Sequence, residues 1–387
     1  MKIKTGTQGI ILIMSFLMMF SPASIKIHAQ VDDLPLTIKC GPFKAMHTQG
    51  IAVDVKKRVV YCSFTTMLAK YDYNGNLLGT VTGLLGHLGC LDIDERDGKV
   101  YGSLEYKDDV IGQGIMKLEK SDKNFQNNFY VAIIDGDKIN RMGMDGGRDG
   151  VVKVVSLPTV LDDYSAKVNV GGKIREHRFA CSGIDGISFG PRFGKISGKQ
   201  YLTVAYGVYG DTDRSDNDYQ VLLQYDIAKW EKYARPLSLD NPTFKGPSKP
   251  AGRYFVHTGS TDWGVQNLEY DASSGLWYMA VYRGKKPNFP NYYLYAVKAA
   301  SRPEVKELVG IPYCTKGKVI PLAEGGLRDE NTGVSGWNFP YGSMGMHSFG
   351  NGYFYFSENK SDKEGQKAVL RLYRRTSGPE GFEPVKR

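Results

Sequence analysis

The sequence predicts an all-β protein with a β-propeller fold, and three observations point to that class. Tyrosine (25) and glycine (46) are both abundant. Short segments alternate apolar and polar residues with a period of two, as β-strands do. Pairs of such segments recur in the same order along the chain, with no helical period between them, which is typical of propeller blades. Dividing the mature length by roughly 50 residues per blade favours seven blades, with six or eight as alternatives.

The N-terminal residues 1–29 are predicted to be a secretory signal peptide. Two lysines precede an apolar stretch over 9–20 that is too short to cross a bilayer. Cleavage would follow Ala23 or Ala29. We therefore expect a secreted or periplasmic protein without a membrane span. Residues 30–387 would form a single propeller domain, because no Pro/Ser-rich linker divides them.

The predicted blades begin with a short strand near a glycine, often ending in aspartate, followed by a turn and a second strand rich in Tyr, Val and Phe. The first copy contains an NGN turn, a strong hairpin signal. Five copies are clear, at 49–81, 88–106, 182–190 and onward, 263–282, and 345–359. Two weaker copies lie at 130–142 and 305–322. Together they would supply seven blades.

Charge and cysteine content exclude some classes of protein. The formal charge of +9 includes three leader lysines, which leaves about +6 on the mature chain. Basic residues are scattered among acids rather than clustered, which argues against nucleic-acid binding and suits an acidic ligand.

The five cysteines allow at most two internal disulfides. A chain of this size does not need them to build a core.

All histidines of the mature chain lie at or near the starts of predicted first strands. In a propeller the innermost strand begins at the face where the second strand ends, so these positions gather around one rim. Any single histidine there is more often a structural hydrogen-bonding group, but five in this placement indicate a chemical role for at least one. Neutral imidazole is well suited to proton transfer near pH 7. The five are His47, His87, His177, His257 and His347.

The ends of the second strands supply companions for these histidines. Arginine can hold a carboxylate through two parallel hydrogen bonds, although each such residue is more often a solvated loop charge. The candidates are Tyr206, Tyr209, Asp211, Arg214, Arg283, Lys285 and Lys286, with Arg178 beside His177.

Other catalytic signatures are absent from the sequence: it has no HExxH, P-loop or strand-to-helix GxGxxG motif. The strand ends show no convincing pair of Asp/Glu residues of the kind an ordinary glycosidase uses. No required cofactor is expected. A structural calcium or zinc ion held by histidines, Asp185 or Asp211 is an open alternative, and the sequence defines no ligand set.

The segment AMHTQGIAVD, which follows the leader at the head of a tyrosine-rich propeller, resembles a known group of enzymes. These are secreted Bacteroides-type seven-bladed propellers that act on L-rhamnose-α-1,4-D-glucuronic acid caps of arabinogalactan and gum arabic, described as glycoside hydrolase family 145 and related to polysaccharide lyase family 42. The resemblance covers the mature chain in layout, and the segment around His47 is its specific part. It implies that His47 carries activity.

The resemblance implies an enzyme that cleaves a terminal rhamnose from glucuronate in an acidic oligosaccharide or polysaccharide. His47 would act with Tyr206 as acid and base, either as a lyase or as an α-L-rhamnosidase. The remaining expected contacts to substrate are Gln49, His87, Arg178, Arg214, His257, Arg283 and His347. Two other functions stay open: a non-catalytic propeller that binds a glycan or a protein, and a lyase for another uronate polysaccharide.

Overall fold

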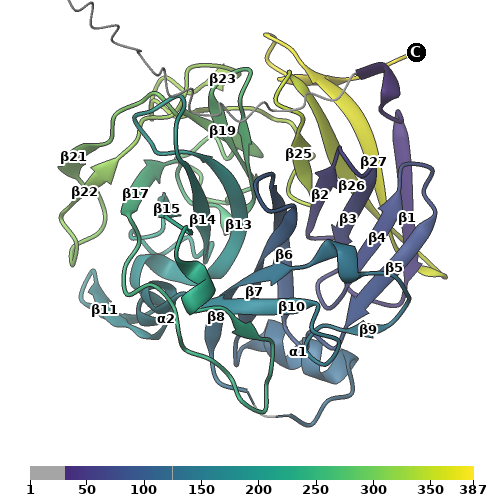
Figure 1. The fold of residues 1–387 in the computed structure, drawn as a ribbon. Helices are drawn as coiled ribbons and strands as arrows, with labels where there is room; N and C mark the ends of the chain where they lie inside the picture. The colour runs from purple at the N-terminus through teal and green to yellow at the C-terminus, as the bar shows by residue number, and fades with distance from the viewer. Residues whose placement is uncertain (1–30, 124) are drawn as a thin grey trace, which may run out of the picture.

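The computed structural model describes residues 31–123 and 125–387, so the predicted signal peptide lies outside the described residues. The strands form five principal sheets arranged as blades around a central channel (Figure 1). Each innermost strand contacts the innermost strands of both neighbouring blades, which closes the ring. In blade order, the innermost strands are β2 (Gly50–Asp54), β6 (His87–Asp94), β13 (Cys181–Pro191), β18 (Asp262–Asp271) and β25 (Met346–Ser348). The chain is thus an all-β propeller.

The outer strands of each blade follow mainly in chain order. Blade 1 continues with β3 (Val59–Ser63), β4 (Leu68–Asp72), β5 (Leu77–Thr82) and the parallel β9 (Met144–Asp145). Blade 2 continues with β7 (Lys99–Tyr106), β8 (Asn128–Ile134), β10 (Val152–Ser156) and β16 (Arg235–Pro236). Blade 3 continues with β14 (Gln200–Val208), β15 (Tyr219–Tyr225), β17 (Gly252–His257), β22 (Lys316–Val319) and β21 (Glu304–Glu307).

The last two blades complete the ring. Blade 4 continues with β19 (Leu276–Tyr282) and β20 (Leu294–Lys298), and a bridge from Leu294 to Trp337 connects it to the ribbon of β23 (Leu327–Arg328) and β24 (Ser335–Gly336). Blade 5 contains β26 (Tyr353–Asp362), β27 (Gly365–Arg375), β28 (Phe382–Pro384) and the N-terminal strand β1 (Thr37–Phe43), which pairs antiparallel with β27. Both ends of the chain therefore build one blade.

The remaining elements are short and lie in the connections. They are the helices α1 (Val110–Leu118) and α2 (Pro158–Ser165), the ribbon of β11 (Lys167–Val170) and β12 (Lys173–Glu176), and four 3-10 turns, η1 (Val31–Asp33), η2 (Gly136–Lys138), η3 (Arg178–Ala180) and η4 (Trp230–Lys232). In the part of the chain that the structure describes, no helix is both long and apolar enough to cross a bilayer.

The expected number of seven blades is wrong. The five clear sequence copies correspond to the five blades, but the two weak copies are outer strands of blades already counted. The segment 130–142 contains β8, the third strand of blade 2, and 305–322 contains β21 and β22 at the edge of blade 3. Long connections and added edge strands make each blade longer than the period assumed for it.

Aspartates at the ends of innermost strands cap the turns that follow, which explains the recurrent strand-ending Asp. Asp54 accepts from the backbone N–H of Lys57, and Asp271 accepts from that of Ser274. Asp94 accepts from the N–H of Arg96 and also pairs with its guanidinium. A short carboxylate that mimics a backbone turn is a common way to fix such hairpins.

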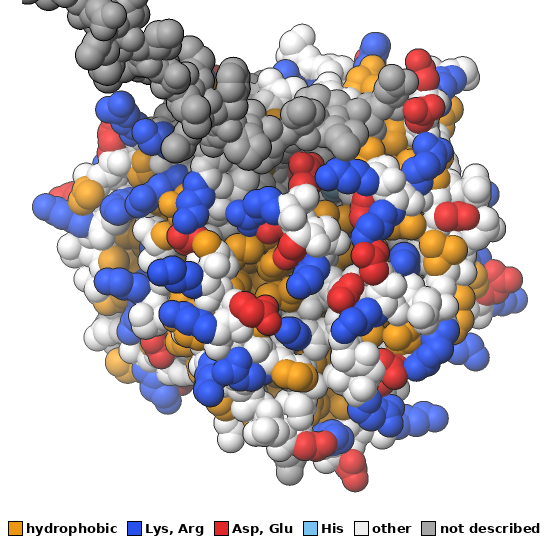
Figure 2. Space-filling view, viewed as in Figure 1, with side chains coloured by type: hydrophobic (Ala, Val, Ile, Leu, Met, Phe, Trp, Pro, Cys, Tyr) orange, Lys and Arg blue, Asp and Glu red, His pale blue; other side chains and the backbone are white. Residues whose placement is uncertain are grey.

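The core lies between the faces of adjacent blades, and the strands β2, β3, β8 and β15 are buried at every position because a neighbouring blade covers each face. Blades 5 and 1, for example, share a cluster that includes Ile38, Val60, Tyr355 and Leu370. On the surface, Lys and Arg side chains are interspersed with Asp and Glu over the visible part of the face in Figure 2, so no field of a single sign covers it.

Candidate functional site

The face at which the innermost strands begin, here called the entry face, brings together polar side chains from blades 1 to 4. His47 and Gln49 precede β2, and Tyr282 ends β19, the strand that pairs with β18. His47 Nε2 lies 3.0 Å from Gln49 Nε2 and 3.5 Å from Tyr282 Oη. An amide nitrogen can only donate, so Nε2 of His47 is the acceptor and the ring proton is on Nδ1.

Burial lowers the pKa of His47 and raises that of Tyr282. At neutral pH the imidazole is therefore neutral and the phenol is protonated. Both side chains are only partly buried, so a ligand at the entry face can reach them. The pair offers a base and an acid side by side.

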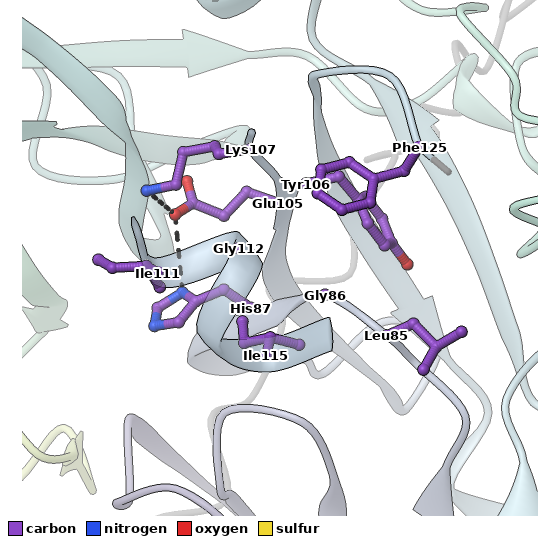
Figure 3. A pocket seen from close by; sticks show the side chains of 10 residues that line it. All are labelled: Leu85, Gly86, His87, Glu105, Tyr106, Lys107, Ile111, Gly112, Ile115 and Phe125. Atoms are coloured by element: carbon purple, nitrogen blue, oxygen red, sulfur yellow. Dashed lines mark ion pairs between the residues drawn. The ribbon is translucent and has the colours of Figure 1, made fainter. Parts of the chain in front are cut away.

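A network of charged groups lies behind this pair, in blades 2 and 3. Lys107 Nζ is 2.5 Å from Glu105 Oε1 and donates to the carbonyl of Ser182. His87 Nδ1 lies 3.7 Å from Glu105 and 3.6 Å from Asp185. Figure 3 shows Glu105 between Lys107 and His87, with the backbone of α1 beside them. The second oxygen of Glu105 accepts from the N–H of Ile184, which fixes the carboxylate.

The groups of this network have different charge states at neutral pH, and burial is the main cause. Burial, and to a smaller extent the charge of Lys107, lowers the pKa of His87 to about 3. Burial and the negative charge of Glu105 raise the pKa of Asp185 to about 8. Burial opposes the charge of Lys107, but Glu105 and Asp109 outweigh it and raise the pKa of Lys107. At pH 7 the network thus holds a neutral imidazole, a protonated Asp185 and an ammonium paired with Glu105.

Bulges in the innermost strands explain why Asp185 lies beside Gln266 in this network. In β13 the pairing with β14 passes from Ile184 directly to Ile187, and in β18 it passes from Val265 to Asn267. An extra residue in a strand re-aims side chains. The displaced Asp185 and Gln266 meet, with Gln266 Nε2 donating to Asp185 Oδ2 at 3.3 Å.

A row of rings lies along the rim beside the charged network. The centroids of Tyr164 and His177 are 4.3 Å apart, those of His177 and Tyr209 are 5.1 Å apart, and those of Tyr209 and Trp263 are 5.6 Å apart. His177, Tyr209 and Trp263 are partly exposed. Such amphipathic rings suit the C–H faces of sugars with polar edges.

The rim also carries backbone strain. Non-glycine residues adopt left-handed φ values at Thr65 (52°), Leu85 (53°), His177 (68°) and Trp263 (62°), each close to the start of an innermost strand. Strain of this kind persists where the surrounding structure holds it, and it concentrates at functional sites.

The structure brings some predicted residues to this site and places others in the frame around it. His47, Gln49 and His87 belong to the site, and His177 lies in the row of rings. Tyr206 is fully buried and its hydroxyl donates to Asp163 at 2.7 Å, so it has no access to a ligand at the rim. Tyr282 occupies the place beside His47 that was expected for Tyr206.

The predicted arginines have structural partners. Arg178 pairs with the buried Asp163 at 2.8 Å. Arg214 is buried, pairs with Asp216 and donates to the carbonyls of Glu176 and His177. Arg283 donates to the carbonyl of Asn291 in its own connection and lies over the ring of Tyr293.

The expected ring of five histidines at one rim is not formed. His257 ends β17, an outer strand of blade 3, and packs against Tyr219 and Phe289. His347 lies in β25 toward the opposite end of the channel, in a group with Asp92 and Glu269. The first strand of blade 5 is short, so its histidine sits near the strand end rather than before the strand.

Two clusters among the described residues contain side chains that can bind a metal ion. At the entry face, His87, Glu105 and Asp185 approach within 4.8 Å of one another. The ammonium of Lys107 already supplies the positive charge there, so this set does not fit a resident cation. Asp92, Glu269 and His347, also within 4.8 Å of one another, are an oxygen and nitrogen donor set of the kind zinc accepts. Backbone N–H groups of Ile93, Phe189 and Ser348 orient the two carboxylates.

That second cluster borders a cavity of about 630 Å³ at the other end of the channel, here called the exit face. Phe189, Tyr270 and Phe349 line it together with strand-end residues of blades 1 and 2. This volume is ample for a small ligand. By contrast, the pocket in Figure 3 has a volume of about 10 Å³ beneath α1, room for roughly one water.

Sequence reasoning missed Glu105, Lys107, Gln266 and Tyr282, and it considered Asp185 only as a metal ligand. The expected absence of a carboxylate pair is wrong in one respect, because Glu105 and Asp185 do converge. Both oxygens of Glu105 are already engaged by Lys107 and the Ile184 N–H, so the two do not form the free pair of an ordinary glycosidase.

No family model and no curated protein matches this chain. Among solved structures it is similar to a glycoside hydrolase family 43 β-1,3-galactosidase (11% identity, 90% of this chain and 99% of that chain, TM-score 0.41). It is also similar to a gluconolactonase from Xanthomonas campestris (10% identity, 87% and 84%, TM-score 0.29) and to the calcium-binding protein regucalcin from Agrobacterium tumefaciens (10% identity, 89% and 95%, TM-score 0.31). At these values the likenesses carry no argument about function, which has to come from the site.

Proposed function

We propose that this protein is a carbohydrate-active enzyme whose active site is the entry face and whose base is His47. The observation that carries the proposal is the geometry at Nε2 of His47, an unprotonated nitrogen held by Gln49 and lying 3.5 Å from the hydroxyl of Tyr282. A neutral imidazole beside a protonated phenol suits proton abstraction at one atom and proton donation at another.

A uronate is the sugar that this site suits best. Asp185, protonated at neutral pH, has a proton to donate to a substrate carboxylate, and Gln266 holds it in place by donating to its Oδ2 while also donating to the carbonyl of Trp263. A hydrogen bond to the substrate carboxylate offsets its negative charge, which otherwise opposes removal of the proton at C5. Trp263 and Tyr209 would stack on the neighbouring sugar. We infer that the substrate is a glycan ending in L-rhamnose-α-1,4-D-glucuronate, in keeping with the HTQG segment.

The reaction that uses these groups most directly is elimination. His47 Nε2 gives up the hydrogen bond from Gln49 and takes the C5 proton of glucuronate, the C4–O4 bond breaks, and Tyr282 protonates O4 as rhamnose leaves. The products are free rhamnose and a 4,5-unsaturated uronide. Hydrolysis is the alternative outcome, in which His47 assists a water molecule with help from the substrate carboxylate, because the site lacks a free pair of enzyme carboxylates.

The proposed setting is outside the cytoplasm, secreted or periplasmic, on the strength of the leader-like N-terminus. An acidic polysaccharide or its fragments would be encountered there. Cell fractionation tests the location of the protein independently of its activity.

The deciding experiment incubates the protein with rhamnosylated glucuronate and follows both products. Release of rhamnose with growing ultraviolet absorbance indicates a lyase, and release without absorbance indicates a hydrolase. If no rhamnose is released from this substrate or from other uronate glycans, the enzyme assignment fails.

A second candidate function is saccharide binding without turnover, and the exit-face cavity favours it. Its aromatic lining and its carboxylate floor would hold a sugar. Calorimetry with the same glycans distinguishes the two functions: binding that survives His47→Ala but weakens in Phe189→Ala, without product, would support the binding protein.

A further inference from the structure

We propose that Cys40 and Cys62 form a disulfide that joins the last blade to the first. Their Sγ atoms lie 3.4 Å apart. Cys62 belongs to β3 of blade 1, whereas Cys40 belongs to β1, which pairs with β27 of blade 5. The bond would therefore cross the seam at which the ring closes, a structural role separate from the proposed activity.

The packing at the seam already holds the two strands in place for this bond. Cys40 is 1% exposed and Cys62 is 0% exposed, within one cluster shared by the two blades. The N–H of Gly41 donates to the hydroxyl of Tyr71 at 2.7 Å across the same seam, which fixes β1 beside β4. A disulfide needs the sulfurs to approach by a further distance of about 1.3 Å, which side-chain rotation and a small strand shift supply.

Cys40 and Cys62 are the two cysteines whose sulfurs the fold brings into contact, whereas the other three have different partners. Cys90 is directed at the carbonyl of Ile187, Cys181 at that of Gly183, and Cys314 at that of Lys316. Each of the three contacts a backbone oxygen rather than another sulfur. An odd cysteine count is then satisfied by one disulfide and three thiols.

The chemistry is thiol–disulfide exchange with an external disulfide, such as oxidised glutathione or an oxidoreductase that carries one. One thiolate attacks the external disulfide and forms a mixed disulfide, releasing one thiol. The second thiolate then attacks this intermediate and releases the other thiol. The two cysteines lose two protons and two electrons in all, and the external disulfide gains them. Both sulfurs are buried in the folded chain, so the exchange belongs to folding, before β1 docks on blade 1.

The test is peptide mapping without reduction, on the full chain refolded with a mixture of reduced and oxidised glutathione. We expect the peptide of Cys40 linked to that of Cys62, with Cys90, Cys181 and Cys314 all open to alkylation after unfolding. We also expect the thermal midpoint of the oxidised protein to exceed that of the reduced protein by several degrees.

Two variants sharpen the test. Cys314→Ser should keep the difference in midpoint between oxidised and reduced protein, and Cys62→Ala should abolish it. If Cys62→Ala does not fold, the wild-type map and midpoints still decide. A native fold with five alkylatable cysteines after oxidative refolding, or a linkage between another pair, would overturn the proposal.

Discussion

At the scale of single residues, the hydrogen bond from Gln49 decides what His47 can do. It directs the lone pair of Nε2 at Gln49, which has to release it before His47 acts as a base, and it leaves the ring proton on Nδ1. Replacing His47 by Ala removes the proposed base, and we expect kcat to fall by a factor of about 10²–10⁴. Steady-state assay on rhamnosylated glucuronate measures this. His257→Ala is the matched control, because that histidine packs at an outer strand; full activity in His47→Ala would move the base elsewhere.

Trp263 gives a prediction of a different kind, because it would touch the sugar without reacting. We expect Trp263→Ala to raise KM by about fivefold, since a stacked ring contributes on the order of 1 kcal/mol, while kcat changes little. Initial rates over a range of substrate concentrations separate the two constants. A loss confined to kcat would contradict a stacking role.

Asp185 makes stability depend on pH in a defined direction. Its pKa is about 8 in the folded protein, against 3.8 as the ordinary value. Between these values the folded state holds a proton that the unfolded state has lost. The contribution is full below pH 3.8 and is lost as pH rises through 8. We expect the free energy of unfolding of wild type, relative to Asp185→Asn, to decrease from pH 5 to pH 8 in urea titrations.

His87 acts on stability in the opposite sense, which the same titrations separate. Its folded pKa of about 3 lies below the ordinary 6.5. Its contribution is therefore present above pH 6.5 and is lost as pH falls toward 3. His87→Gln should reduce the loss of stability below pH 6.5 and leave the alkaline slope of Asp185 in place. An unchanged acid limb in this variant would show that His87 is not the buried neutral group described.

At the scale of elements, the bulges of β13 and β18, and a further one in β6 between Leu88 and Leu91, determine which side chains reach the site. The alternation of apolar and polar residues predicts these strands but not their bulges, because an extra residue interrupts the alternation for only two positions. That is why His47, which precedes a strand, could be predicted as a site residue, whereas Asp185 was considered only as a metal ligand and Gln266 was missed. Their signal is an apolar pair separated by two residues instead of one, as in IDGI and VQNL.

Gly183 at the start of β13 offers a test of this local geometry. Its φ is +130°, and a Cβ there would overlap Glu105 Oε2. We expect Gly183→Ala to lower the free energy of unfolding by roughly 2–4 kcal/mol, from backbone strain and displacement of the carboxylate. Gly171→Ala is the control: its φ is +59°, but nothing lies within 4 Å of the added atom, so about 1 kcal/mol is expected. Equal losses in urea unfolding would show that Glu105 is not held there.

At the scale of the whole molecule, the number of blades depends on pairing between segments that are far apart in the sequence. The repeats at 130–142 and 305–322 have the local pattern of a blade, yet their partners are β7, β10 and β17, strands of blades already formed. Pairing between distant segments, rather than pattern within a segment, determines which strands share a sheet. The sequence therefore predicts a propeller and its five clear first strands, but not how many blades close the ring.

Closure of the ring depends on β1, which gives the last prediction. β1 is the strand of blade 5 supplied from the opposite end of the chain, and it buries Ile38 and Cys40 against blade 1. A chain of residues 44–387 would leave β27 with an open edge and the seam exposed, so we expect it to lose cooperative unfolding. Among the described residues, a chain of 34–387 loses η1, whose Val31 and Asp32 carbonyls accept from Arg387 and whose Val31 carbonyl also accepts from the N–H of Leu34, and we expect a cost of about 1 kcal/mol.

A peptide of residues 31–43 added in trans distinguishes a missing strand from general misfolding. It should pair with β27 in the register from Thr37↔Arg371 to Cys40↔Ala368 and restore a cooperative transition, because backbone pairing to an open edge recovers both hydrogen bonds and buried area. A peptide with Ile38→Asp should not rescue, since it would place a charge in the shared core. Cooperative unfolding of 44–387 by itself, or rescue by the Asp peptide, would show that the ring closes without this strand.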